Sequence, residues 1–133
     1  MHLKIITHDR IVFDEDVNEI YTKGVDGEFG ILKGHIPVVS ALDIGVTKVV
    51  QNDICKFFTT MGGIFQFKND EATILTDTAE DGSDIDITRA KAAKERAEAR
   101  LAEKNANVDV KRAEAALSRA LARLKTAMVA TQK

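Results

Sequence analysis

The chain has 133 residues, of which 44% are hydrophobic and 30% charged, and its formal net charge is −2. This length holds one ordinary domain or a small domain with an appendage, and it excludes two large domains. No apolar run reaches the roughly 20 residues of a membrane span, and the N-terminus lacks a signal-peptide core. We therefore expect a chain that stays on the cytosolic side and does not insert into the membrane.

Charge is divided unevenly along the chain. Residues 1–84 carry 7 Lys and Arg against 15 Asp and Glu, a net charge of −8, whereas residues 85–133 carry 12 against 6, a net charge of +6. We predict two domains with these bounds, which contact different partners or each other.

The first domain contains short segments in which apolar and polar residues alternate, the pattern of half-buried strands. The expected strands are residues 3–7, 11–13, 17–23, 38–42, 44–50, 54–61, 64–68 and 72–76, and turn signals stand at 25–28, 51–53 and 68–71. Because no helical segment separates these strands, the fold class is α+β, with an N-terminal antiparallel β-sandwich or flattened barrel.

All seven aromatic residues lie in this first domain, which should therefore hold the main hydrophobic core. The single cysteine, Cys55, has no partner for an internal disulfide. Because it stands in an apolar run, we expect a buried small side chain rather than a reactive thiol.

Three glycines and the only proline of the chain fall within residues 27–37. They give the backbone unusual dihedral angles and a fixed stop. The segment is either a structured turn at one end of the sandwich or an exposed loop that offers Glu28, Ile31 and His35 to a partner. The chain contains no phosphate-loop pattern, and His35 has no neighbouring ligands for a metal.

The second domain, rich in Ala, Lys, Arg and Glu, is predicted to form two helices in an antiparallel hairpin. We expect one helix over about residues 86–104, with a capping box at Ser83 and Asp86, and a second from about Asp109 onward after a break at 105–107. The apolar stripes are Ile87, Ala90, Ala97 and Leu101, and Val110, Ala113, Leu117, Leu121, Leu124 and Met128. Because alanine buries little surface, the hairpin should be able to fold on the sandwich or to open.

Both predicted helices carry arginines at the spacing i, i+7 and i+11, namely Arg89, Arg96 and Arg100, and Arg112, Arg119 and Arg123. At 100° per residue each trio lies within about 40° on its helix. Arg96 and Arg119 have no carboxylate at i±3 or i±4 that would neutralise them.

Three interpretations of these arginines remain open. They form a solvated basic face, or the folded hairpin brings both trios onto one anion such as phosphate, which arginine binds bidentately. Nucleic acid is the third, but the acidic first domain and the lack of aromatic residues in the basic half argue against it. An enzyme finds no support, because the chain has no nucleophile with a base, no metal-ligand spacing and no Walker loop.

Four motifs together resemble the ε subunits of bacterial and chloroplast F-type ATP synthases. They are GEFGILKGHIP at 27–37, MGG at 61–63, LTDTAE at 75–80 and IDITRA at 85–90. The last is similar to the ATP-binding motif I/L-D-x-x-R-A of that family. The chain departs from the family at Lys33, where many members have proline, and this should loosen the loop slightly.

The resemblance implies a non-catalytic subunit of the central rotor stalk, peripheral on the cytoplasmic face of a bacterial membrane or the stromal face of a thylakoid. The sandwich would bind the γ subunit and rest on the ring of c subunits through Glu28, Ile31 and His35. The hairpin would move between a compact form and an extended form. The extended form would reach into the α/β hexamer, meet an acidic segment of β and block ATP hydrolysis.

The resemblance also implies that the compact hairpin holds ATP as a regulatory ligand, without hydrolysis and without a need for Mg²⁺. The matching positions are Glu80, Ile85, Asp86, Arg89, Ala90, Arg96, Arg119 and Arg123. Glu80 and Asp86 would face adenine and ribose, Ile85 and Ala90 would make apolar contacts, and the arginines would bind phosphates. The alternative is a purely structural stalk adaptor that senses no nucleotide. No obligatory cofactor or metal is expected in either case.

Overall fold

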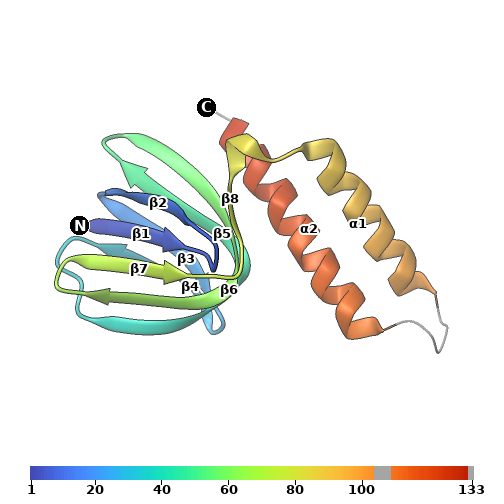
Figure 1. Ribbon diagram of the computed structural model, residues 1–133, viewed down its shortest axis with the longest axis horizontal. Coiled ribbons are helices and arrows are strands. Elements are labelled where there is room, and N and C mark those ends of the chain that lie inside the picture. Colours follow the sequence, from blue (N-terminus) through green and yellow to red (C-terminus); the bar gives the residue numbers. More distant parts are fainter. Residues whose placement is uncertain (104–108, 132–133) are drawn as a thin grey trace.

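The computed structural model describes residues 1–103 and 109–131. The strands are β1 (His2–Ile6), β2 (Ile11–Asp16), β3 (Glu19–Gly24), β4 (Gly27–Leu32), β5 (Val38–Gln51), β6 (Ile54–Lys68), β7 (Glu71–Leu75) and β8 (Ala79–Asp81). A 3-10 turn, η1 (Gly82–Asp84), then leads to the helices α1 (Ile87–Ala102) and α2 (Val110–Thr131). Figure 1 shows the strands as a sandwich and the two antiparallel helices beside it, with α2 between the sheet and α1. The predicted α+β architecture is confirmed.

The strands of the sandwich form one hydrogen-bonded sheet that folds over on itself (Figure 1). The strand order is β2-β1-β7-β6-β5-β3-β4, and β8 pairs with β6 beside this path. The pairings are antiparallel, as predicted, except that β1 and β7 run parallel. This parallel pairing joins strands from the two ends of the domain. The local alternation of apolar and polar residues does not predict which distant strands pair.

The strands β5 and β6 are each continuous where the sequence predicted two shorter strands. Their pairing skips Asp43 and Gly62, so the ladder bends there without ending. Gly62 and Gly63 have φ angles of 76° and 111°. A Cβ atom at Gly63 would lie only 1.9 Å from the carbonyl oxygen of Leu75, so glycine is required at this bend.

The two predicted Asn-Asp hairpins are confirmed. Asn52 and Asp53, between β5 and β6, have φ angles of 49° and 69°. Asn69 and Asp70, between β6 and β7, have φ angles of 52° and 62°. Both residues of each turn are thus left-handed, a conformation that Asn and Asp tolerate and that matches the twist of a two-residue hairpin.

The glycine-rich segment differs from its prediction. Its first half is the edge strand β4, which pairs with β3 across the predicted tight turn, and only residues 33–37 form a loop. A Cβ atom at Gly30 would lie 2.8 Å from the ring of Tyr21, its partner on β3. The glycine therefore serves to seat an aromatic ring against a strand rather than to open a loop.

The first domain holds the main core, as the aromatic residues predicted. Phe13 packs edge-on against Phe58 with ring centroids 5.3 Å apart, and Phe29 packs in the same way against Phe65 at 5.4 Å. The other buried members of this core are Leu3, Ile5, Val17, Ile20, Ile31, Leu42, Val49, Phe67, Ala72, Ile74 and Ala79.

The prediction of a buried Cys55 is wrong, since the thiol is exposed. Cys55 lies at the end of the β5–β6 hairpin, next to the turn, where Ile54 is also 57% exposed. The apolar run therefore begins before the strand reaches the core.

A line of buried hydroxyl groups runs across the three neighbouring strands β3, β5 and β6. The Oγ1 atom of Thr47 lies 2.8 Å from that of Thr22 and 3.1 Å from that of Thr60. All three side chains are buried, with exposed fractions of 0% to 2%. Each hydroxyl has a hydrogen-bond partner, so these polar groups are tolerated inside the sheet.

The cap of α1 is Asp86 rather than Ser83. The Asp86 carboxylate accepts a hydrogen bond from the backbone N–H of Arg89 at 3.0 Å. Ser83 lies within η1, and its backbone N–H donates to the carboxylate of Asp81. The predicted helix start near residue 86 is confirmed, but the cap is Asp86 itself and not Ser83.

The helix α2 begins at the predicted position, and its cap is Asp109, which accepts a hydrogen bond from the backbone N–H of Arg112 at 3.1 Å. The predicted break at 105–107 lies outside the described residues. The helices run as an antiparallel pair, so the hairpin topology agrees with the sequence (Figure 1).

The helix α2 is buried on two opposite faces. Ala122 and Thr126 face β5 and η1. The opposite face, toward α1, buries Ala113, Ala120, Leu124 and Ala127. The predicted stripe is wrong at Val110, Leu121 and Met128, which are 52%, 45% and 54% exposed. The predicted stripe follows the large apolar residues, whereas the buried residues of α2 are mostly alanines. Alanine side chains let two helices approach closely.

Candidate functional site

A cleft of about 440 Å³ lies where the sandwich meets the hairpin. Residues of β8 and η1 form one wall, the first turns of α1 form the second, and α2 forms the third. The lining residues are Glu80, Asp84, Ile85, Asp86, Arg89, Ala90, Ala93, Arg96 and Arg123. The volume falls within the range of about 300–1,000 Å³ that is typical of small-molecule sites.

Three carboxylates and three arginines share this cleft. The carboxylate of Asp86 is engaged with the first turn of α1, so it fixes the helix start at the mouth of the cleft. The N-terminal end of a helix carries a partial positive charge and favours an anion. The cleft therefore combines a helix terminus with guanidinium groups, which is an arrangement suited to a phosphate.

Glu80 and Arg123 form an ion pair across the cleft. The Nε–H group of Arg123 donates to Oε1 of Glu80 at 2.6 Å, and the two side chains are 31% and 37% exposed. The backbone N–H of Glu80 donates to the hydroxyl of Thr59 at 3.0 Å. Glu80 is thus anchored on β6 while it binds a side chain of α2, so this pair ties the sandwich to the hairpin.

Arg89 and Arg96 stand on the same face of α1, seven residues apart, with Ala90 and Ala93 between them. Both arginines are exposed. Neither makes an ion pair with another residue in the described part of the chain. Their guanidinium groups are therefore available to an anion in the cleft.

The structure gathers seven of the eight positions that the resemblance assigns to ATP: Glu80, Ile85, Asp86, Arg89, Ala90, Arg96 and Arg123. Arg119 does not line the cleft. The sequence missed Asp84 and Ala93. Ala93 was predictable, since it lies one helical turn from both Arg89 and Arg96.

The interpretation in which both arginine trios face one anion would place six arginines around one cleft, but the cleft is lined by three of them. Arg89 and Arg96 of the first trio and Arg123 of the second line the cleft, and the other three do not. Arg123 is neutralised by an ion pair. Its partner, Glu80, is 43 residues away in the sequence and lies outside any search along one helix.

Of the three residues predicted to contact a ring of subunits, Glu28 and His35 are exposed and Ile31 is not. Ile31 is 1% exposed and is paired with Ile20 of β3 inside the core. The prediction that Ile31 is available to a partner is therefore wrong. Successive residues of a strand point to opposite faces, and the side chain of Ile31 is on the face toward the core. The ring of His35 packs edge-on against Phe67 at 6.1 Å, so the loop rests on the sandwich.

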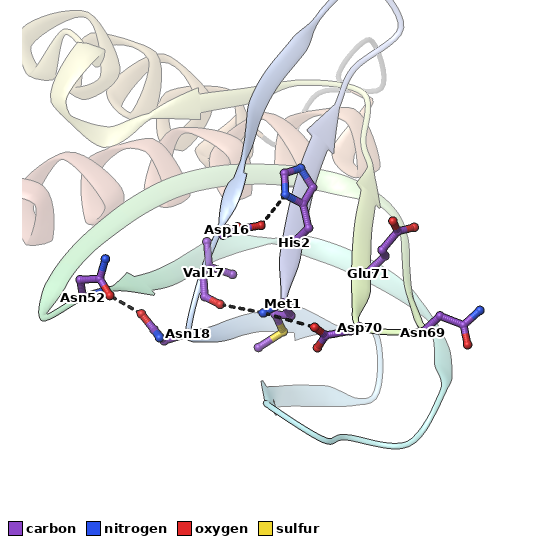
Figure 2. Close-up of a pocket in the computed structure, with 9 residues that line it drawn as sticks. All are labelled: Met1, His2, Asp16, Val17, Asn18, Asn52, Asn69, Asp70 and Glu71. Carbon is purple, nitrogen blue, oxygen red and sulfur yellow. Dashed lines mark hydrogen bonds and ion pairs between the residues drawn. The ribbon is translucent and has the colours of Figure 1, made fainter.

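A second hollow, of about 460 Å³, lies at the N-terminus and is shown in Figure 2. Its polar groups bind one another. The Met1 ammonium group donates to the carbonyl of Val17 at 3.2 Å, and the His2 ring bonds to Asp16 at 2.7 Å and to Asp14. These bonds raise the pKa of the His2 imidazole, that to Asp14 most strongly and that to Asp16 next.

The described residues contain no group of three or more His, Cys, Asp and Glu side chains arranged to hold a metal ion. Neither described helix has the length and hydropathy that a membrane crossing requires.

Two family models cover the chain. Residues 1–82 match the model described as ATP synthase, Delta/Epsilon chain, beta-sandwich domain, and residues 83–128 match that described as ATP synthase, Delta/Epsilon chain, long alpha-helix domain. The chain belongs to the ATP synthase delta/epsilon family. The family resemblance of the four sequence motifs is thereby confirmed.

Curated members of this delta/epsilon family are similar over most of their length. The ATP synthase epsilon chain of Desulforamulus reducens is 46% identical over 101 residues, which cover 74% of this chain and 75% of that one. The ATP synthase epsilon chain of Lawsonia intracellularis is 44% identical over 101 residues, which cover 76% of each chain.

Solved structures show that the delta/epsilon fold is shared more widely. A chain of the Euglena gracilis mitochondrial ATP synthase, in a structure of OSCP, F1 and the c-ring, has a TM-score of 0.82 and 24% identity and covers 95% of this chain and 79% of that one. A chain of the Tetrahymena thermophila mitochondrial ATP synthase, in a structure of the central stalk and c-ring, has a TM-score of 0.60 and 15% identity, with 96% of both chains covered.

Proposed function

We propose that this chain is the non-catalytic epsilon subunit of an ATP synthase central stalk. In this role it couples rotation to ATP synthesis and limits ATP hydrolysis through its helical hairpin. Its membership of the delta/epsilon family and its identity of more than 40% with epsilon chains support this role. The protein would lie at the membrane periphery, on the cytoplasmic face in a bacterium or the stromal face in a plastid.

The proposed partners are the γ subunit and the c-ring for the sandwich, and the α/β hexamer for an extended hairpin. Glu28 and the loop at 33–37 with His35 are exposed and suit a contact with the ring. The basic residues of α2, Arg119, Arg123 and Lys125, suit an acidic segment of β. Opening the hairpin would release Arg123 from Glu80 for such a contact.

We further propose that ATP binds in the cleft as a regulatory ligand. The observation that supports this most directly is that arginines from both helices line one cleft, Arg89 and Arg96 from α1 and Arg123 from α2. A polyphosphate that contacts both helices stabilises only the closed hairpin. At a concentration of about a hundred times its Kd, a ligand adds about 2.7 kcal/mol to the state that binds it. Guanidinium groups supply the positive charge that faces the phosphates, so ATP binds without Mg²⁺ in this proposal.

The test is equilibrium binding of ATP, ADP and GTP to the full chain, without Mg²⁺. ATP should bind, should bind more tightly than GTP, and should be recovered unchanged. Absence of binding heat for all three nucleotides would instead leave the structural adaptor that senses no nucleotide. One observation favours that alternative: Arg123 already has a carboxylate partner and does not need a ligand.

A further inference from the structure

Glu80 differs from the other carboxylates of the cleft. Among the described residues, it alone of the three contacts a guanidinium group, since Asp86 binds a backbone N–H and Asp84 makes no ion pair. Arg123 is correspondingly the one arginine of the cleft that is engaged, whereas Arg89 and Arg96 are not. Two of the three arginines that line the cleft therefore lack an ion pair among the described residues, and the third is paired with Glu80.

The position of Glu80 is fixed by the sheet. In the β6–β8 pairing Glu80 stands opposite Thr59, and its N–H donates to the Thr59 hydroxyl. Its carboxylate presents an anionic oxygen 2.6 Å from Nε of Arg123. A phosphate oxygen would make the same kind of charge-assisted bond to this nitrogen. The two anions therefore compete for the Nε–H group, one of the five N–H donors of the Arg123 guanidinium group.

We infer that the Glu80 carboxylate holds the place of one phosphate group beside Arg123. Its carboxylate neutralises Arg123 when no ligand is bound, and a phosphate oxygen reaches Nε of Arg123 only by displacing it. This inference rests on the proposed function of the cleft and adds a role for Glu80 opposite to the one implied by the family resemblance. A carboxylate on the adenine and ribose side favours binding of the nucleoside, whereas a carboxylate that pairs with Arg123 disfavours binding of the phosphates.

The two roles predict different outcomes for Glu80→Gln, with inorganic triphosphate as the probe because it has no base or ribose. For a residue on the adenine and ribose side, the substitution leaves triphosphate binding unchanged. For a placeholder, the substitution frees Arg123 and tightens triphosphate binding by about fivefold, a factor that corresponds to about 1 kcal/mol for a partly exposed ion pair. Glu80→Asp keeps the charge, but its side chain is shorter by one methylene and reaches Arg123 less well. It should therefore also tighten triphosphate binding.

Asp84→Asn is the matched control, since it removes one negative charge from the same cleft without releasing an arginine. Binding of triphosphate to each variant is measured by calorimetry, after circular dichroism has shown native secondary structure. The placeholder is supported if Glu80→Gln gains affinity and Asp84→Asn changes it by less than twofold. It is overturned if Glu80→Gln binds triphosphate no more tightly than the wild type, or if Asp84→Asn gains as much.

ATP binding by the wild type separates this inference from the proposed function. A wild type that binds ATP, together with a Glu80→Gln variant that gains nothing for triphosphate, retains the function and rejects the placeholder. A wild type that binds no nucleotide, together with a Glu80→Gln variant that binds triphosphate, rejects the function and supports the placeholder.

Discussion

Gly82 lies so close to Thr126 that a Cβ atom on the glycine would be 2.7 Å from the threonine carbonyl oxygen. The same atom would lie 2.8 Å from the Cβ atom of Ala130. The turn η1 and the helix α2 therefore meet almost backbone to backbone. Docking of the hairpin on the sandwich depends on the absence of a side chain at this position.

Gly82→Ala should therefore loosen α2 from the sandwich while it leaves the sheet intact. Overpacking of this kind costs about 1–3 kcal/mol, and the helix is able to relieve it by moving away. Hydrogen exchange of the α2 amides should become faster, while the amides of β5 and β6 keep their protection. Ser118→Ala, at an exposed position of the same helix, is the control. Unchanged exchange in α2 would show that the contact does not hold the helix.

Thr47→Val should destabilise the sandwich although the two side chains have nearly the same shape. The substitution removes the hydroxyl that bonds to both Thr22 and Thr60 and leaves both without this partner. Unsatisfied buried polar groups cost about 1–3 kcal/mol. Urea unfolding of the variant should show the loss, and Thr73→Val, at a half-buried position of β7, should show little. Equal stability of both variants would contradict the role of the buried hydroxyl line.

The bonds of the His2 ring to Asp14 and Asp16 should make the stability of the fold depend on pH. The pKa of His2 is raised from its ordinary value of 6.5 by its bonds to Asp14 and Asp16, so folding favours the protonated ring. Its contribution is full below the unfolded pKa and is lost as the pH rises through the folded pKa. His2→Gln should therefore destabilise the protein more at about pH 5.5 than at about pH 9. His8→Gln, at an exposed position, is the control. A difference in stability between His2→Gln and the wild type that does not change with pH would refute this role of His2.

The features that the sequence predicted well depend on neighbouring residues. The Asn-Asp turns follow from the tolerance of these side chains for left-handed backbone, and Asp109 caps α2 through a bond to a residue three positions later. Seven of the cleft residues are implied by the family resemblance, through the motifs LTDTAE and IDITRA and the arginines of the two helices. Each of these signals is contained within a few turns of chain.

The features that the sequence missed depend on residues that meet only in the folded chain. Glu80 neutralises Arg123 across 43 residues, so no inspection of one helix reveals the pair. The glycines that flank Ile31 predict an exposed loop, but its pairing with Ile20 places the side chain in the core. The helix α2 was given one apolar face because it was considered alone, whereas it packs between two layers.

The most direct test of the cleft compares ATP binding by Arg96→Gln and Arg100→Gln in the full chain. Both substitutions remove one positive charge from α1, but only Arg96 lines the cleft. Arg96→Gln should weaken ATP binding tenfold or more, which corresponds to a loss of about 1.4 kcal/mol, and Arg100→Gln should stay close to the wild type. Equal affinities for the two variants, whether both unchanged or both reduced, would contradict a nucleotide site at this position.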